Sequence, residues 1–409
     1  MTTPPSSATD FLAEVMALAG GERTVTCYQC GTCSGSCPTV RQMEYTPRQI
    51  LRLIQLGMED RLLRSLAILY CLACYSCTAR CPREIKITET LIGLRKLAAA
   101  RGIELPGNLL ALKGTLVDQY NISGDANDTR LIWSENLEEV AAAVRPALSG
   151  AEGPKRQAET VYFVGCVSSF FPVAYPIPQS LVQIMMNLDE DFTLLGGDEW
   201  CCGYPLYSAG MEALLPSFAE HNIATVKAIG ARRLVVTCPS CYYTWTHIYP
   251  DLASSPLPFE VLHASQYLAR LMEGGRLKLH DPSASLRTRV EQVVTYHDPC
   301  DLGRKSGIYD APREVISRIP GVELREMATS RENATCCGGG GDVQVVDESV
   351  TASVAARRVR QAERTGAKVI LSACQQCKRT LASAARKEKI RLRALDITEL
   401  VWQAMEFRT

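Results

Sequence analysis

Eight of the 18 cysteines of this chain fall in two short runs with the same spacing, and this feature constrains the fold most strongly. The runs read CYQCGTCSGSCP and CLACYSCTARCP, so each follows the pattern C-x2-C-x2-C-x3-C-P. This pattern is typical of proteins with two cubane 4Fe–4S clusters, in which the fourth cysteine of one run binds the other cluster. Two zinc sites are the alternative, but zinc usually takes two separated cysteine pairs. We therefore expect two cubanes, one on Cys27, Cys30, Cys33 and Cys81 and the other on Cys71, Cys74, Cys77 and Cys37.

The sequence between the two runs predicts helices rather than strands. Thr46 offers an N-cap before Pro47, apolar residues follow at helical spacing, and Gly57 suits a helix end. We therefore expect an N-terminal tail at 1–20 and an all-α dicluster ferredoxin domain at 21–105. Residues 106–157 are expected to form a helical connector and linker, in which Arg130 and Trp133 pack the ferredoxin domain against the following domains.

The other ten cysteines form an internal repeat. Each half has a leading cysteine, a Cys-Cys-Gly element and a C-x2-C pair, and equivalent cysteines are 134 to 136 residues apart. Apolar, strand-like runs precede the leading cysteine and the C-x2-C pair of each half, and helical patterns follow the pairs. This alternation predicts two tandem α/β domains with parallel sheets, at 158–290 and 291–409, whose cysteines lie at the carboxyl ends of strands.

The two Cys-Cys-Gly elements restrict the chemistry. Adjacent Cα atoms are about 3.8 Å apart, which is less than the roughly 4.4–6.8 Å of a relaxed disulfide. A disulfide between neighbours would be strained, and one zinc ion bound by both thiolates would be cramped. Five thiolates in each half are one more than a cubane uses, which points to an expanded or opened cluster with a bridging cysteine. Gly203 and Gly338 would let the backbone approach such a cluster closely.

The whole chain resembles the heterodisulfide reductase family. The motifs that carry this likeness are CYQCGTC, CLACYSC, GCVSSFFP, CCGYPLYSAG, HDPCDLGRKSGIYDAPRE and CCGGGGD. It is similar to the family's C-type iron–sulfur polypeptide fused to its B-type catalytic polypeptide, whose cysteine-rich domains are called CCG domains; the D-type polypeptide of the membrane-bound form has this arrangement. The resemblance implies two noncubane 4Fe–4S clusters that form the catalytic centre, one on Cys166, Cys201, Cys202, Cys238 and Cys241 and the other on Cys300, Cys336, Cys337, Cys374 and Cys377.

The resemblance implies reduction of a disulfide between the two noncubane clusters, with electrons arriving through the cubanes. Iron–sulfur subunits of glycolate oxidase, lactate utilisation and anaerobic glycerol-3-phosphate dehydrogenase share the same plan. An electron-relay subunit of a flavin-dependent 2-hydroxy-acid or glycerol-3-phosphate dehydrogenase is therefore the alternative function, and a structural metal-binding protein is a third. Because the sequence has no flavin or nicotinamide motif, the electron donor must be a partner. We expect a flavoprotein or a cytochrome b, within a hetero-oligomer.

Two further predictions concern the substrate. His297, three residues before Cys300, could donate a proton to a leaving thiolate, but a hydrogen bond that braces the turn together with Asp298 is the favoured alternative. When the two halves are aligned at their cysteines, aromatic residues of the first half coincide with basic residues of the second. The basic residues are predicted to bind an anionic part of the substrate, with ordinary solvated surface cations as the alternative, and they are Arg304, Lys305, Lys378 and Arg379.

Net charge and hydropathy exclude some classes of partner and some cellular locations. The chain has 44 basic and 44 acidic residues, so its formal charge of zero argues against binding nucleic acid through bulk charge. No segment of the sequence reads as a transmembrane helix, and the N-terminus lacks the basic start of a secretory signal. We expect a cytoplasmic protein of anaerobic metabolism that reaches a membrane, if at all, through a partner.

Overall fold

The structure, a computed structural model, describes residues 8–135, 157–279 and 292–405. The predicted linker lies almost entirely outside the described residues. The chain divides into two compact units. The first takes in the chain up to Leu112 together with Pro205–Leu215 and Thr335–Ala355, and the second takes in Lys113–Tyr204, Pro216–Ala334 and the chain from Ala356 onward.

The N-terminal region is helical throughout its described residues, as expected. Thr46 and Gln49 form a capping box at the start of α3, Pro47 is its first residue, and Ile50 and Ile54 are buried on its inner face. The helices are α1 (Ala8–Ala17), η1 (Thr24–Thr26), α2 (Thr32–Ser36), α3 (Pro47–Gln55), α4 (Glu59–Leu63), η2 (Leu66–Ile68), α5 (Ser76–Ala79) and α6 (Ile87–Ala100). The described part of the connector contains α7 (Gly107–Gln119) and η3 (Asn127–Ser134).

Helix α1 differs from the expected N-terminal tail. Phe11 and Val15, one helical turn apart, are fully buried in the hydrophobic core of the first unit. A short amphipathic helix of this kind gains its stability from burying one face, so its packing partners decide whether it forms. The ordered ferredoxin region therefore begins before residue 21.

Two four-stranded parallel sheets form the framework of the second unit, as the repeat predicts. The strand orders are equivalent, β2-β1-β3-β4 and β6-β5-β7-β8. The strands of the first sheet are β1 (Thr160–Phe163), β2 (Phe192–Leu194), β3 (Arg233–Val236) and β4 (Glu260–His263). Those of the second are β5 (Gln292–His297), β6 (Val322–Leu324), β7 (Val369–Ser372) and β8 (Arg393–Asp396). In each sheet the leading cysteine and the C-x2-C pair directly follow the two central strands.

The helices connect the strands in the same order in both halves. The first half contains α9 (Cys166–Phe170), η4 (Pro172–Ala174), α10 (Pro176–Asn187), η5 (Gly196–Asp198), α11 (Tyr204–Ser208), η6 (Glu212–Leu214), α12 (Leu215–Ile229), α13 (Pro239–Tyr243), the π-helix η7 (Thr244–Ile248), α14 (Tyr249–Leu252) and α15 (Ala264–Glu273). The second contains α16 (Asp310–Ser317), η8 (Arg331–Asn333), α17 (Val343–Val346), α18 (Glu348–Glu363), α19 (Gln375–Lys387) and α20 (Ile397–Ala404).

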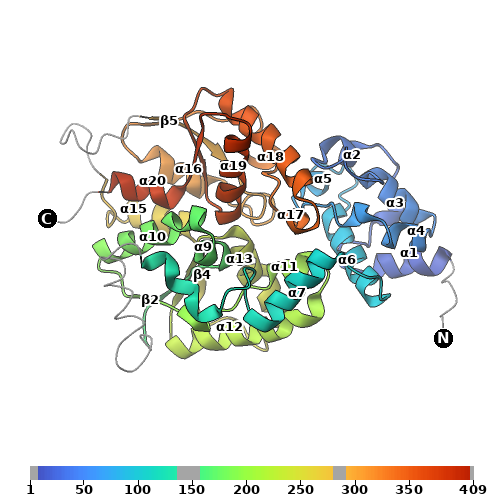
Figure 1. Cartoon of the computed structure of the whole chain (residues 1–409), viewed down its shortest axis with the longest axis horizontal. Coiled ribbons are helices and arrows are strands. Elements are labelled where there is room, and N and C mark those ends of the chain that lie inside the picture. The colour runs from blue at the N-terminus through green and yellow to red at the C-terminus, as the bar shows by residue number, and fades with distance from the viewer. Residues whose placement is uncertain (1–7, 136–156, 280–291, 406–409) are drawn as a thin grey trace. The chain divides into compact units, whose positions relative to one another are not determined.

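One hydrophobic core joins the two sheets of the second unit. Helices α10 and α15 of the first half pack against α20 and α16 of the second, and Figure 1 shows the four side by side. Tyr162 and Val235 of the first sheet and Val294 and Leu371 of the second belong to the same buried cluster. The halves are therefore held together by apolar burial, the main favourable contribution to folding.

Within the part of the chain that the structure describes, no helix combines the length and the apolar character needed to cross a lipid bilayer.

Candidate iron–sulfur sites

The first predicted cubane ligands surround one cavity in the first unit. Cys27, Cys30 and Cys33 of the first run line one pocket together with Cys81, the last cysteine of the second run. Its remaining wall includes apolar residues such as Leu51 and Ile87 and the basic residues Arg48 and Arg83. The structure thus brings these four thiols to one place, although Cys33 and Cys81 are 48 positions apart in the sequence.

The second predicted set surrounds another pocket of the first unit. Cys71, Cys74 and Cys77 line this pocket together with Cys37, and Thr88 lies in its wall. Burial raises the pKa of the Cys37 thiol to about 12 when no metal is bound. A bound cation would remove that penalty, because it favours the thiolate.

The backbone of both runs is shaped in the same way. The second and fourth residues after each first cysteine have positive φ angles: Gln29 (65°) and Gly31 (86°), then Ala73 (48°) and Tyr75 (61°). Left-handed residues alternating with right-handed ones turn successive N–H groups toward one side and create a concave site for anions, as at many iron–sulfur clusters. Non-glycine residues rarely adopt this conformation, so its recurrence fits the binding of a cluster.

The first cysteine-rich half gathers five buried thiols into one continuous string in the second unit. Neighbouring thiols along the string interact with one another: Cys166 with Cys201, Cys201 with Cys202, Cys202 with Cys241, and Cys241 with Cys238. The hydrogen bond with Cys201, and then Arg130, lower the pKa of the Cys166 thiol to about 7, against the effect of burial. Five converging sulfur ligands, with a readily ionised thiol among them, suit a multi-iron cluster better than one tetrahedral zinc ion.

Polar side chains hydrogen-bond the backbone of the Cys-Cys pair in this half. Asn222 donates to the carbonyl oxygen of Cys201 at 3.1 Å, and the hydroxyl of Tyr249 donates to that of Cys202 at 3.0 Å. The Gly203 N–H donates to Cys201 Sγ at 3.4 Å, with Gly203 at a φ of 81°. Hydrogen bonds of this kind to ligand sulfurs are among the factors that set the reduction potential of an iron–sulfur cluster.

The second cysteine-rich half reproduces parts of this geometry. In the first unit, Gly338 donates to Cys336 Sγ at 3.3 Å and Gly339 to Cys337 Sγ at 3.4 Å, and Gly338 has a φ of 94°. In the second unit, Cys374 Sγ accepts from the Cys377 N–H at 3.4 Å, while Cys300 is partly exposed. Convergence of all five on one cluster stays a prediction.

His297 is buried at the end of β5. Its Nδ1 accepts a hydrogen bond from Nε of Arg358 at 3.0 Å, so the ring proton of the neutral histidine is on Nε2. Its ring lies within 4.8 Å of Cys377 Sγ. Asp298 pairs with Arg313 at 2.7 Å and accepts a hydrogen bond from the backbone N–H of Arg331 at 2.8 Å, so the choice between a proton donor and a structural brace stays a prediction.

The four predicted substrate-binding cations all contact protein groups. Lys305 is buried between the rings of Tyr204 and Tyr243 and pairs with Asp301 at 2.8 Å. Lys378 pairs with Glu399 at 2.7 Å, and both side chains are buried. Arg304 donates to the carbonyl oxygen of Ala334. Arg379 stacks on Phe171 of the first half, with 3.9 Å between the guanidinium carbon and the ring centroid. Arg379, a basic residue of the second half, thus lies against an aromatic residue of the first half.

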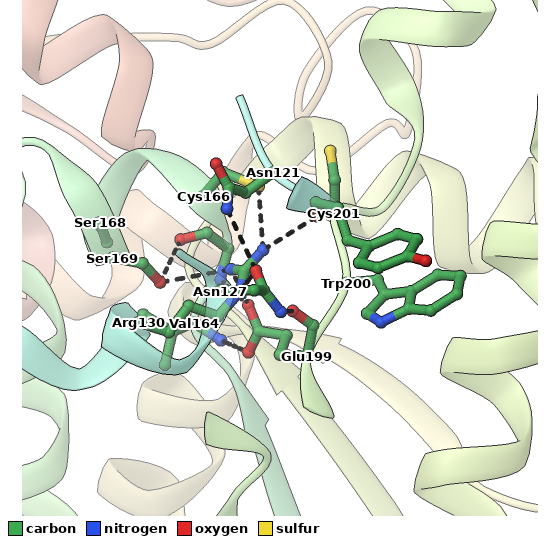
Figure 2. A network of polar contacts seen from close by, with 12 residues as sticks. Asn121, Asn127, Arg130, Val164, Cys166, Ser168, Ser169, Glu199, Trp200 and Cys201 are labelled. Atoms are coloured by element: carbon green, nitrogen blue, oxygen red, sulfur yellow. Dashed lines mark hydrogen bonds and ion pairs between the residues drawn. The ribbon is translucent and has the colours of Figure 1, made fainter. Parts of the chain in front are cut away.

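Three polar residues near the sites were not assigned a site role from the sequence. Arg130 of the connector contacts Cys166 and Glu199 in the network of Figure 2, whereas the sequence predicted only a packing role. Gln375, inside the second C-x2-C pair, contacts the loop before Cys166. Arg95 of α6 is fully buried in the first unit and donates to the carbonyl oxygens of Cys71 and Gly341. The sequence offers one signal for these three residues: each is a charged or amide residue inside an apolar or cysteine-rich segment.

Comparisons with known proteins agree with this division of the chain. A 4Fe-4S dicluster domain model matches residues 26–86, and a cysteine-rich domain model of the CCG family matches residues 160–245 and 294–382. The D-type polypeptide of dihydromethanophenazine:CoB–CoM heterodisulfide reductase from Methanosarcina barkeri is 32% identical over 344 residues, which are 83% of this chain and 78% of the relative. The same polypeptide of Methanosarcina acetivorans is 33% identical over 82% of this chain and 77% of its own length. The EtfAB:quinone oxidoreductase of Syntrophomonas wolfei is 27% identical over 82% of this chain and 46% of its own length.

Proposed function

Because the chain belongs to the D-type heterodisulfide reductase family and is an iron–sulfur oxidoreductase of that family, we propose that it reduces a disulfide at its cysteine-rich halves. Two electrons and two protons convert one disulfide into two thiols. The electrons enter through the two cubanes of the ferredoxin region. The substrate is a small-molecule disulfide with an anionic part.

The string of five buried thiols in the first half is the observation that carries this proposal. A protein that only relayed electrons would need no more than the four thiolates of a cubane, whereas five sulfurs from three separate segments converge here. The repeat supplies a second set of five at equivalent sequence positions, and we assign the second noncubane cluster to it. When bound, such clusters supply one-electron steps and iron atoms with affinity for sulfur.

The chain's own residues would hold and orient the substrate. His297, whose Nε2 carries the ring proton, is our candidate for donating a proton to a leaving thiolate. Arg379 lies on the aromatic surface of Phe171 and is the cation most suited to an anionic group. An anion near Lys305 or Lys378 competes with Asp301 or Glu399, so these lysines contribute less.

The electron donor in our proposal is a flavoprotein or a cytochrome b within a larger complex. The name of the D-type relatives includes dihydromethanophenazine, so a reduced organic carrier belongs to their reaction. The EtfAB:quinone oxidoreductase favours the second candidate function, an electron relay to or from a flavoprotein. Both functions use the cubanes, and they differ in whether the cysteine-rich halves bind substrate.

Anaerobic thiol release separates the two functions. The protein is incubated with reduced methyl viologen and a panel of disulfides, and thiols are counted. We expect two thiols per disulfide from the wild type, little change in Cys74→Ser because viologen bypasses the cubanes, and loss of release in Cys202→Ser. A fully loaded wild type that transfers electrons from viologen to a quinone analogue but releases no thiol from any disulfide contradicts the proposal and favours the relay.

A further inference from the structure

The Arg130 side chain is a buried cation in direct contact with a predicted cluster ligand. Its Nη2 lies 3.3 Å from Cys166 Sγ, and its Nη1 lies 2.8 Å from Glu199 Oε1. The exposed fractions of the two charged side chains are 2% and 1%. Figure 2 shows the guanidinium between the carboxylate and the thiol.

The orientation of the guanidinium is fixed from several sides. Its Nε donates to Asn127 Oδ1 at 3.0 Å, and the ring of Phe170 covers it, with 5.3 Å from the guanidinium carbon to the ring centroid. Glu199 is held in turn by the backbone N–H groups of Val164 and Gly165, each at 2.8 Å, so its position does not depend on Arg130 alone. Arg130 therefore presents one N–H group to Cys166 in a defined geometry, away from water.

A fixed positive charge at this distance changes the relative stability of the oxidised and reduced states of a cluster. Reduction adds a negative charge, and a nearby cation or a hydrogen bond to a ligand sulfur stabilises the reduced state. The effect is strong where water is excluded. Glu199 acts in the opposite direction, but its charge faces the guanidinium and the two backbone N–H groups, while Arg130 alone of the pair contacts the sulfur.

The second half has a different arrangement at its leading cysteine. At the offset of the Cys-Cys pairs, Ala334 occupies the position equivalent to Glu199. The cation near Cys300, the counterpart of Cys166, is Lys305, which interacts electrostatically with that thiol and pairs with Asp301 at 2.8 Å. Cys300 is partly exposed, whereas Cys166 is buried and accepts a hydrogen bond directly from Arg130. The two halves, although alike in fold, therefore surround their leading cysteines differently.

We infer that Arg130 is a positioning residue that raises the reduction potential of the cluster in the first cysteine-rich half, so that this cluster is reduced before the one in the second half. This inference rests on the proposed function, because it requires a cluster in each half. The first-half cluster would then accept the first electron. The two clusters that act on the substrate would have unequal reduction potentials.

Potentiometric titration followed by electron paramagnetic resonance tests the inference without measuring turnover. In Arg130→Gln, we expect the ratio of reduced to oxidised first-half cluster at a fixed ambient potential to fall about tenfold, which is about 59 mV for a one-electron couple. In Glu199→Gln the potential should rise, because the opposing charge is removed. Arg130→Lys should retain most of the wild-type value. Arg276→Gln, which removes an arginine from the half-exposed ion pair with Glu190, is the matched control and should not change it.

Opposite shifts in the two single variants are the decisive outcome, since a purely structural role would move both in one direction. An unchanged potential in Arg130→Gln at full iron content overturns the inference, and so does loss of iron from all three network variants, which would assign Arg130 to folding alone. If the wild type shows no noncubane signal in either half, the proposed function itself fails. The two failures are therefore distinguishable.

Discussion

The side chain of Gln375 accepts a hydrogen bond from the backbone N–H of Ser168 at 3.0 Å, although the two residues are 207 positions apart and belong to different halves of the repeat. Its Nε2 also donates to the carbonyl oxygen of Val164 at 2.6 Å and to Thr237 Oγ1 at 2.7 Å. Gln375 stands between Cys374 and Cys377, so one turn of the second half is bonded directly to the loop that carries Cys166. This amide fixes the position of the second C-x2-C pair relative to the first cluster site.

Replacing Gln375 should loosen the contact between the halves. In Gln375→Ala the buried groups of Ser168 and Val164 lose their partner, at a cost of about 1–3 kcal/mol for each buried polar group left unpaired. We expect the melting temperature of the anaerobic protein to fall by several degrees. Gln376→Ala is the control, because Gln376 donates to Thr380 within its own helix. Equal melting temperatures of the two variants would show that the contact contributes little.

The two cubane cavities predict which cysteine variants affect the same cluster. Cys37→Ser should perturb the same resonance signal as Cys74→Ser, because Cys37 lines the cavity of the second run. Cys81→Ser should in turn resemble Cys30→Ser. If Cys37→Ser instead matched Cys30→Ser, each run would bind its own cluster and the crossed assignment would be wrong.

Gly341 predicts a steric dependence at the second cubane. A Cβ added to Gly341 would collide with the carbonyl oxygen of Cys71, and the residue has a φ of 64°. Gly341→Ala should therefore displace the backbone of a cluster ligand and lower the iron content by up to one cubane, or about four irons. Gly107→Ala is the control, since nothing lies within 4 Å of its added Cβ. Full iron content in Gly341→Ala would mean that the backbone there adjusts freely.

Arg379 predicts a dependence on substrate charge. A charge-assisted contact contributes about 1.5–3 kcal/mol, so Arg379→Ala should lower kcat/KM for an anionic disulfide by roughly ten- to a hundredfold. A neutral disulfide should be reduced at nearly the wild-type rate. Arg386→Ala, an exposed substitution on the same helix α19, serves as the control. Wild-type kinetics of Arg379→Ala with both substrates would leave the anionic subsite without support.

The sequence predicted the features that follow from local patterns. Helix α3 begins at Pro47, as expected, because the residues that cap it are contiguous in the sequence. Strands of parallel sheets are buried on both faces and therefore read as continuous apolar runs. The runs before Cys166 and Cys300 have this character, and they form β1 and β5. The repeat itself predicted two α/β halves with parallel sheets, which the structure contains.

The sequence did not predict features that depend on distant partners. Phe11 and Val15 appeared to belong to a tail because their packing partners lie in other helices. Lys378 appeared free to bind an anion because its partner Glu399 lies 21 positions further along the chain. The Arg130–Glu199 pair, 69 positions apart, joins the connector to the loop before the first Cys-Cys pair, and no local pattern reports such a contact.

Iron, acid-labile sulfide and zinc, measured on one anaerobic sample, test the central claim most directly. Two cubanes and two noncubane clusters on the 18 cysteines predict about 16 irons and about 16 sulfides per chain, without stoichiometric zinc. About eight irons would restrict the clusters to the ferredoxin region, and stoichiometric zinc in the cysteine-rich halves would make them structural sites. Either result would contradict the assignment of a redox centre to the five thiols of the first half.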